Sequence, residues 1–202
     1  MKEVIAGPAG RLQLVVESPS AQPRALALSC HPHPLHGGSL TNKVVHQLAR
    51  SFVELGAVSV RFNFRGVGDS EGVFDNGAGE TDDLQAVAAR ALDEWPGLPL
   101  WLAGFSFGAY VALRAADKLN PGWLLTVAPP VNMYDFSSLQ PAVRRWLLIQ
   151  GEDDEIVPGA AVKAWAGGLA RPPERVTLDG AGHFFHGRLN DLKQVVLERA
   201  PV

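Results

Sequence analysis

The sequence predicts an α/β protein built on a doubly wound, mostly parallel sheet with helices on both faces. Two observations carry this prediction. Segments of strand character alternate with segments of helical periodicity along most of the chain. The strands are nearly all apolar, as in residues 25–29, which is typical of strands covered on both faces. Only the opening segments, residues 4–6 and 12–16 around a turn at 7–10, predict an antiparallel hairpin.

The remaining elements follow in chain order from apolar runs, capping residues and helix breakers. The expected strands after the hairpin are residues 25–29, 57–64, 98–103, 123–128, 145–150 and 175–178. The expected helices are one capped by Asn42 and running to residue 55, and four over residues 80–95, 109–118, 160–169 and 189–199. No repeat, linker or low-complexity segment divides the chain. Its 202 residues, 47% of them hydrophobic, therefore predict a single domain over residues 1–202.

Composition excludes several classes of function. The formal net charge is −3 and the basic residues are scattered, so neither nucleic acid nor an anionic membrane surface is an expected partner. No apolar run approaches the ~18–20 residues of a membrane span, and the N-terminal residues lack the apolar region of a signal peptide. The lone Cys30 stands in an apolar run and predicts a buried thiol, with which a reducing compartment is compatible. We therefore expect a cytoplasmic protein.

The pentad Gly104-Phe105-Ser106-Phe107-Gly108 is the strongest local signal in the chain. It follows a predicted strand and precedes a predicted helix, which is the context that a nucleophile elbow requires. A turn this sharp strains the backbone at Ser106 and leaves no room for side chains at positions 104 and 108. The alternative is a small-residue turn that contains an incidental serine.

An acid and a base follow later strands, in the order that this kind of site needs. The strand at 145–150 leads into Gly151 and the four acids Glu152 to Glu155, and the strand at 175–178 leads into a loop with His183. A serine hydroxyl needs a base to take its proton, and a carboxylate to orient that base. Position favours His183 over His186 as the base. Asp153, Asp154 and Glu155 all remain open as the acid.

The loop at residues 31–38 lies where the second oxyanion-hole donor is expected. The N–H of Phe107, the residue after the nucleophile, is the first donor. The prolines of the loop have no N–H, which leaves His33 or Leu35 as the second donor, and we favour Leu35. The same loop contains His31, His33 and His36 in an H-x-H-x-x-H spacing that could hold zinc in a metallohydrolase. A binding wall shaped by these prolines and histidines is the interpretation that we prefer.

Five segments together resemble the α/β-hydrolase superfamily over nearly the full length, and within it a compact, lid-less group of mostly bacterial predicted hydrolases. They are His31-Pro-His-Pro-Leu-x-Gly-Gly38, Arg61-Phe-Asn-Phe-Arg-Gly-Val-Gly68, Gly104-Phe-Ser-Phe-Gly108, Gly151-Glu-x-Asp154 and Gly180-Ala-Gly-His-Phe-Phe-x-Gly187. The resemblance implies a catalytic triad of Ser106, Asp154 and His183. It singles out Asp154 among the acids, and it implies serine hydrolase chemistry. We expect no cofactor and no metal.

The connector between the strands at 123–128 and 145–150 is too short for a helical cap. We therefore expect an open, shallow site, suited to small or exposed acyl groups. The residues expected at its border are His33, Leu35, Phe107, Met133, Tyr134, Phe136 and Phe184. The expected activity is the hydrolysis of small carboxylic esters or thioesters. A catalytically silent binding module is the alternative, and a homodimer through an exposed edge strand is left open.

Overall fold

The computed structural model describes residues 2–201; residues 1 and 202, the ends of the predicted domain, lie outside this range. Its strands are β1 Lys2–Gly7, β2 Gly10–Glu17, β3 Ala25–Cys30, β4 Ala57–Phe62, β5 Leu100–Phe105, β6 Trp123–Val127, β7 Trp146–Gly151 and β8 Glu174–Leu178. Its helices are the 3-10 turn η1 Pro34–His36 and α1 Lys43–Glu54, α2 Ala78–Glu94, α3 Phe107–Leu119, α4 Gly159–Gly167 and α5 Leu189–Arg199.

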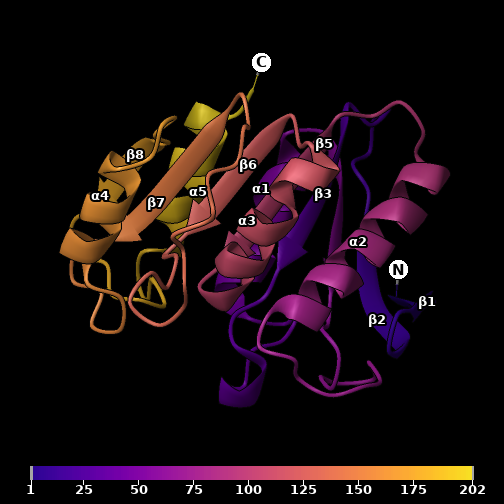
Figure 1. Cartoon of the computed structure of the whole chain (residues 1–202). Helices are drawn as coiled ribbons and strands as arrows, with labels where there is room; N and C mark the ends of the chain where they lie inside the picture. The colour runs from indigo at the N-terminus through magenta and orange to yellow at the C-terminus, as the bar shows by residue number, and fades with distance from the viewer. Residues whose placement is uncertain (1, 202) are drawn as a thin grey trace.

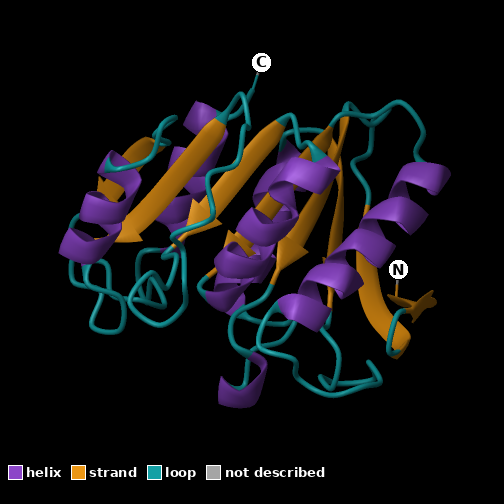
Figure 2. Ribbon diagram, in the orientation of Figure 1, coloured by secondary structure: helices purple, strands orange, loops and turns teal. Residues whose placement is uncertain are grey.

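All the described strands form one sheet in the order β1-β2-β4-β3-β5-β6-β7-β8. β2 is antiparallel to both of its neighbours, β1 and β4, whereas every pairing from β4 across to β8 is parallel. Helices α2, α3 and α4 cover one face of the sheet, and α1 and α5 cover the other (Figures 1 and 2). The predicted doubly wound, mostly parallel architecture is thus confirmed.

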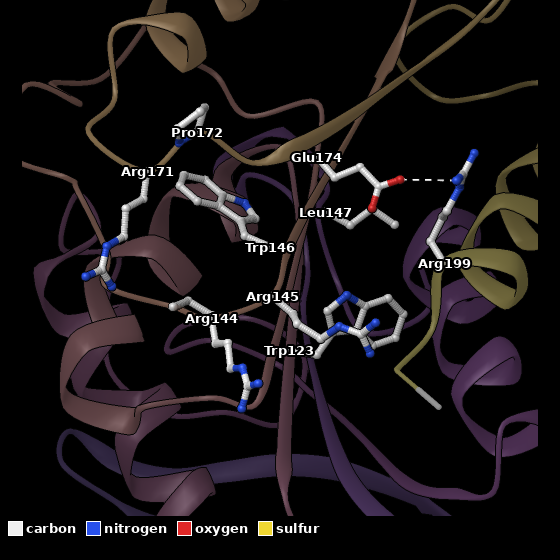
Figure 3. A pocket seen from close by; sticks show the side chains of 10 residues that line it. Trp123, Arg144, Arg145, Trp146, Leu147, Arg171, Pro172, Glu174 and Arg199 are labelled. Carbon is white, nitrogen blue, oxygen red and sulfur yellow. Dashed lines mark ion pairs between the residues drawn. The ribbon is translucent and has the colours of Figure 1, made fainter.

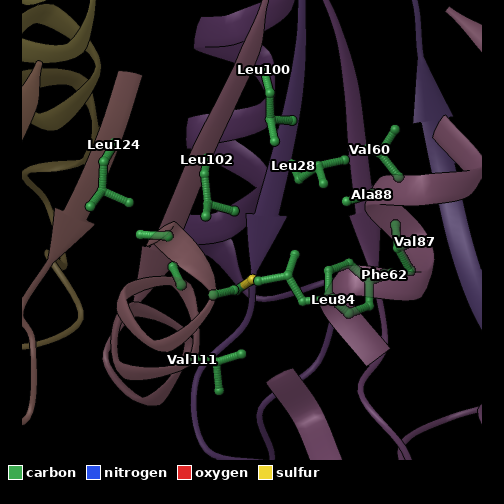
Figure 4. Packing of buried hydrophobic residues seen from close by; sticks show 14 of the residues in the cluster. Leu28, Val60, Phe62, Leu84, Val87, Ala88, Leu100, Leu102, Val111 and Leu124 are labelled. Carbon is green, nitrogen blue, oxygen red and sulfur yellow. The ribbon is translucent and has the colours of Figure 1, made fainter. Parts of the chain in front are cut away.

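The two helical layers require the continuous apolar strands seen in the sequence. Successive side chains of a strand point to opposite faces, so each central strand supplies two cores. In β5, Leu100 and Leu102 pack toward α2 and α3, whereas Trp101 and Phe105 pack toward α1 and α5. Figure 4 shows the first of these cores, with Leu28, Leu102 and Leu124 of neighbouring strands facing the helical layer. Because neither face of β5 meets water, its sequence shows no alternation of polar and apolar residues.

Two boundaries differ from the sequence prediction for identifiable reasons. Helix α2 begins at Ala78, earlier than expected, because the Glu80 carboxylate accepts hydrogen bonds from the Gly77 N–H (2.7 Å) and the Asp75 N–H (2.9 Å). Strand β4 ends at Phe62 rather than at residue 64. Beyond it, the Phe64 N–H donates to the His31 ring instead of to a neighbouring strand. The turn η1 had no signal of its own in the sequence.

The connection between β6 and β7, residues 128–145, contains no helix or strand, so no cap domain is inserted there. Cys30 is buried at the end of β3, and this burial raises the pKa of its thiol. Within residues 2–201, every helix falls short of the length and apolar character that a membrane crossing requires.

Candidate active site

Ser106 occupies a strained turn between β5 and α3. Its backbone has φ 53° and ψ −121°, and its N–H donates to the Val127 carbonyl of the neighbouring strand at 2.8 Å. A Cβ atom at Gly104 would lie 2.1 Å from the Gly108 carbonyl oxygen, and one at Gly108 would lie 2.3 Å from the Cys30 carbonyl oxygen. Only glycine fits at both positions. The turn therefore holds the serine hydroxyl at the carboxyl edge of the sheet, at the N-terminus of α3.

Three side chains from three strand ends form a continuous hydrogen-bonded path. The His183 Nε2 atom lies 3.1 Å from the Ser106 Oγ, and its Nδ1 atom lies 2.9 Å from the Asp154 Oδ2. All three residues are buried, with His183 only 2% exposed. An ionised Asp154 accepts a hydrogen bond from the Nδ1–H group of His183, which leaves Nε2 without a proton and free to accept one from the serine hydroxyl. This tautomer is the one that a general base at His183 requires.

Asp154 is held ionised by its surroundings. Its Oδ1 accepts hydrogen bonds from the Val157 N–H (2.7 Å) and the Ile156 N–H (3.0 Å), and the Gln150 side-chain amide donates to its Oδ2 at 2.9 Å. Burial raises the pKa of Asp154, but the hydrogen bonds from His183 and from these N–H groups outweigh it and leave the pKa below its usual value.

The other acids of this turn lie elsewhere. Glu152 and Asp153 are exposed, and Glu155 accepts a hydrogen bond from the backbone N–H of His183 at 3.0 Å instead of contacting the imidazole. His186, the rival base, is also exposed and stacks on the ring of Phe184, with 5.9 Å between ring centroids. No sequence motif predicts the role of Glu155, because its hydrogen bond depends on how the loop after β7 packs against the loop after β8.

Leu35 is not available as an oxyanion donor, contrary to the expectation from the sequence. In the 3-10 turn η1 the Leu35 N–H donates to the His33 Nδ1 at 3.2 Å. The backbone N–H of His33 has no acceptor among residues 2–201, and the same holds for the N–H of Phe107 at the start of α3. The His33 ring also lies against the Phe107 ring, with 5.2 Å between centroids. The free donor of this loop is thus on His33, the alternative that the sequence left open.

The three histidines of this loop do not form a metal site. Burial lowers the pKa of His31 to about 4, its Nδ1 donates to the Pro32 carbonyl at 2.7 Å, and its Nε2 accepts from the Phe64 N–H at 3.0 Å. With both ring nitrogens occupied, His31 cannot join His33 and His36 around a cation. Within the described residues no three of the usual ligand side chains are grouped for metal binding.

Aromatic side chains pack around His33 and around Phe107, the residue that follows Ser106. The His33 ring lies 4.8 Å from Phe74 and 6.4 Å from Tyr134, and Tyr134 stacks on Tyr110 at 4.6 Å. Burial, with smaller contributions from Tyr110 and Glu80, raises the pKa of Tyr134 to about 12, so its hydroxyl stays protonated.

The other predicted border residues divide into two groups. Met133 is 53% exposed and Phe184 is 38% exposed, as a site border requires. Phe136 is 4% exposed and packs on Tyr110 and Trp165, and the side chain of Phe107 is 1% exposed, so the expected place of these two side chains at the border is wrong. Phe74 was missed, because the stretch that contains it has no recognisable motif.

The same fold occurs in known proteins. Residues 33–147 match the family model described as serine aminopeptidase, S33. An uncharacterised protein of Rickettsia prowazekii is 34% identical, over 94% of this chain and 84% of its own length.

Two solved structures are similar over the whole chain. One is a Xanthomonas campestris protein described as an α/β serine hydrolase without lid. It is 46% identical with a TM-score of 0.95, and the match covers 100% of this chain and 95% of that one. The other is an α/β serine hydrolase homologue from Coxiella burnetii. It is 44% identical with a TM-score of 0.96, and the match covers 100% of this chain and 97% of that one.

Proposed function

The chain belongs to the α/β serine hydrolases, in the family described as serine aminopeptidase, S33, and on that basis we propose that it cleaves small carboxylic esters by acyl transfer to water. One observation carries the proposal. The hydrogen-bonded path from Ser106 Oγ through His183 to Asp154 is complete, and its serine stands on an elbow with a strained backbone.

In the first half of the reaction, Ser106 Oγ attacks the ester carbonyl while His183 Nε2 takes its proton. Asp154 keeps the imidazole oriented and stabilises the positive charge that forms on it. The carbonyl oxygen becomes an oxyanion that accepts hydrogen bonds from the N–H groups of Phe107 and His33. Each such donor contributes about 10²–10³-fold to the rate of acyl transfer. Collapse of the tetrahedral intermediate expels the alcohol, which leaves with the proton from His183.

In the second half, His183 takes a proton from water as the water attacks the acyl-serine. A second oxyanion forms at the same two donors, and its collapse releases the carboxylic acid and returns the proton to Ser106. The uncapped site supports small or protruding acyl groups as substrates, since residues 128–145 form no cover over them. Thioesters fit the same steps, because thiolates are better leaving groups than alkoxides.

A fluorophosphonate probe tests the proposal without any choice of substrate. We expect the wild-type protein at neutral pH to be labelled at Ser106, as located by peptide mass spectrometry, and His183→Ala to lose the label. His186→Ala is the matched control, since this histidine lies on the same loop and is exposed. A folded wild-type protein that takes up no label would contradict the proposal and favour a catalytically silent binding module.

A panel of chromogenic substrates then tests the substrate class. We expect p-nitrophenyl acetate and butyrate, or the corresponding thioesters, to be cleaved much faster than amino-acid p-nitroanilides. Faster cleavage of the anilides would contradict ester hydrolysis as the main activity. It would favour the aminopeptidase activity that the family description names.

We also propose a cytoplasmic location, which the single free and buried Cys30 supports, because a reducing compartment keeps such a thiol unpaired. A homodimer is the assembly to test by size-exclusion chromatography with light scattering. The sheet ends in β1 on one side and β8 on the other, and both edges are available for pairing within the described chain.

A further inference from the structure

A groove opens at the amino ends of β6, β7 and β8, the opposite end of the sheet from Ser106. Its volume is about 470 Å³, within the range of ~300–1,000 Å³ typical of small-molecule sites. Trp123 and Trp146, the first residues of β6 and β7, lie at its base, and Pro172 lies in the loop before β8 (Figure 3). The proposed esterase mechanism uses none of these residues.

The groove is strongly basic although the protein as a whole is acidic. Among the described residues that line it are the arginines Arg144, Arg145, Arg171 and Arg199, and the single acid Glu174. Arg199 pairs with Glu174 at 3.3 Å. Within residues 2–201, the guanidinium groups of Arg144, Arg145 and Arg171 have neither an ion-pair partner nor a hydrogen-bond acceptor. Figure 3 shows these three side chains together with the two indoles that line the groove.

This arrangement contrasts with four arginines elsewhere in the fold. Arg11, Arg61, Arg65 and Arg90 each pair with a carboxylate at 2.7–2.9 Å. In the groove, four arginines line one hollow with a single acid, and the positive potential that they create there attracts anions. The base of the groove is rigid, because the Trp146 Nε1–H donates to the buried Thr126 Oγ1 at 2.9 Å. A second hollow beside it shares Arg144 and Arg145 and has no acidic residue among those that line it.

We propose that this groove binds a small organic molecule that carries two or more neighbouring anionic groups, phosphate or carboxylate. The planar guanidinium fork binds either group through two parallel hydrogen bonds, and unpaired arginines are free to do so. Several arginines around one hollow favour an oligoanion over a single anion, since each anionic group meets its own guanidinium. The edges of the indole rings and Pro172 provide an apolar surface for the organic part.

Isothermal titration calorimetry in metal-free buffer tests the proposal with three probes: pyrophosphate, citrate and inorganic phosphate. We expect pyrophosphate or citrate to bind in a 1:1 complex at least about tenfold more tightly than phosphate, with an affinity that falls as salt is added. The tighter of the two identifies the anionic group as phosphate or carboxylate.

The double variant Arg144→Gln/Arg171→Gln should weaken binding of the oligoanion by about tenfold or more. Both side chains are exposed and unpaired, so this variant should keep the melting temperature of the free protein. Arg50→Gln, an exposed arginine on α1 outside the groove, is the matched control and should bind as the wild type does.

Ser106→Ala should also bind normally, which separates this proposal from the esterase proposal. Equal weak binding of all three probes, or binding that the double variant leaves unchanged, would reveal an adventitious ion only and overturn the proposal. So would the absence of any measurable heat.

Discussion

Of the four consecutive acids from Glu152 to Glu155, Asp154 is the buried one, and its carboxylate faces the imidazole of His183. Asp154→Asn should therefore lower kcat by about 10⁴-fold, because the amide can hold the wrong imidazole tautomer. Asp153→Asn, a neighbour with an exposed side chain, is the control and should stay within about threefold of the wild type. Ester hydrolysis by the two purified variants is the measurement. Similar losses in both variants would remove Asp154 from its proposed role.

Glu155 is a positioning residue that holds the base loop through the backbone N–H of His183. Because a small misplacement of a reacting group is costly, Glu155→Ala should lower kcat by about tenfold and leave KM unchanged. Glu155→Gln keeps an oxygen acceptor and should restore most of the rate. Steady-state kinetics with melting temperatures for both variants distinguish this role from general destabilisation. A rise in KM at constant kcat would show that Glu155 acts on substrate binding instead.

His31 gives the stability of the fold a pH dependence, because its hydrogen bonds require a neutral ring. Its pKa of about 4 lies below the ordinary value of 6.5, so the unfolded chain binds the extra proton between these two values. The stabilisation is therefore complete above pH 6.5 and is lost as the pH falls toward 4. For a shift of this size it amounts to about 3 kcal/mol.

Urea unfolding of wild type and His31→Asn from about pH 7.5 to about pH 4.5 measures this contribution. The variant should lose less of its unfolding free energy over this range than the wild type does. His186→Asn, at an exposed histidine, should keep the wild-type pH dependence. Equal slopes for wild type and His31→Asn would show that the proton of His31 is not linked to folding.

For single residues, the sequence predicted a functional role where the residue comes directly after a strand. The serine, the acid and the histidine follow β5, β7 and β8, and parallel strands place such residues together. The choice between Leu35 and His33 depends instead on a hydrogen bond within a 3-10 turn. The burial of Phe136 depends on how an irregular connector folds back onto Tyr110. Neither leaves a periodic signal in the sequence.

Among the elements, the junction of β5, α3 and β3 has the least tolerance for change. A methyl group at Gly108 would meet the backbone of Cys30, which cannot move without displacing β3. Gly108→Ala should therefore cost several kcal/mol, on the order of 3, or prevent folding.

Gly167→Ala is the matched control for this prediction. The position lies in α4, and a methyl group added there would meet no other atom within 4 Å. Alanine should therefore stabilise the fold by up to about 1 kcal/mol through its helix propensity. Thermal unfolding of both variants provides the comparison. A Gly108→Ala protein as stable as the wild type would show that the elbow has room to relax.

The elements themselves were predictable from the sequence, and their ends were less so. The spacing of apolar residues and the composition of a segment predict a helix or a strand, because both reflect which faces of that element are buried. The ends of α2 and β4 are set by side chains that arrive from elsewhere, Glu80 in one case and His31 in the other. A pattern within one short segment cannot predict a hydrogen bond to a residue that lies outside the segment.

For the whole molecule, the missing cap predicts how the rate depends on the physical state of the substrate. With residues 128–145 forming no cover, no element has to open at a lipid surface. Hydrolysis of p-nitrophenyl butyrate should therefore follow a single saturation curve through the solubility limit of the ester. A sharp rise in rate above that limit would indicate interfacial activation and contradict the open site.

The order of strands across the sheet also governs when activity can first arise during synthesis. From β5 onward, each new strand adds to the growing edge of the sheet in the order in which it is made. The serine follows β5, but its acid and its base follow β7 and β8. A nascent chain can thus form the turn at Ser106 on the ribosome before His183, the proposed proton acceptor, has been synthesised. The proposed triad of Ser106, Asp154 and His183 is therefore complete only once the final strand has docked.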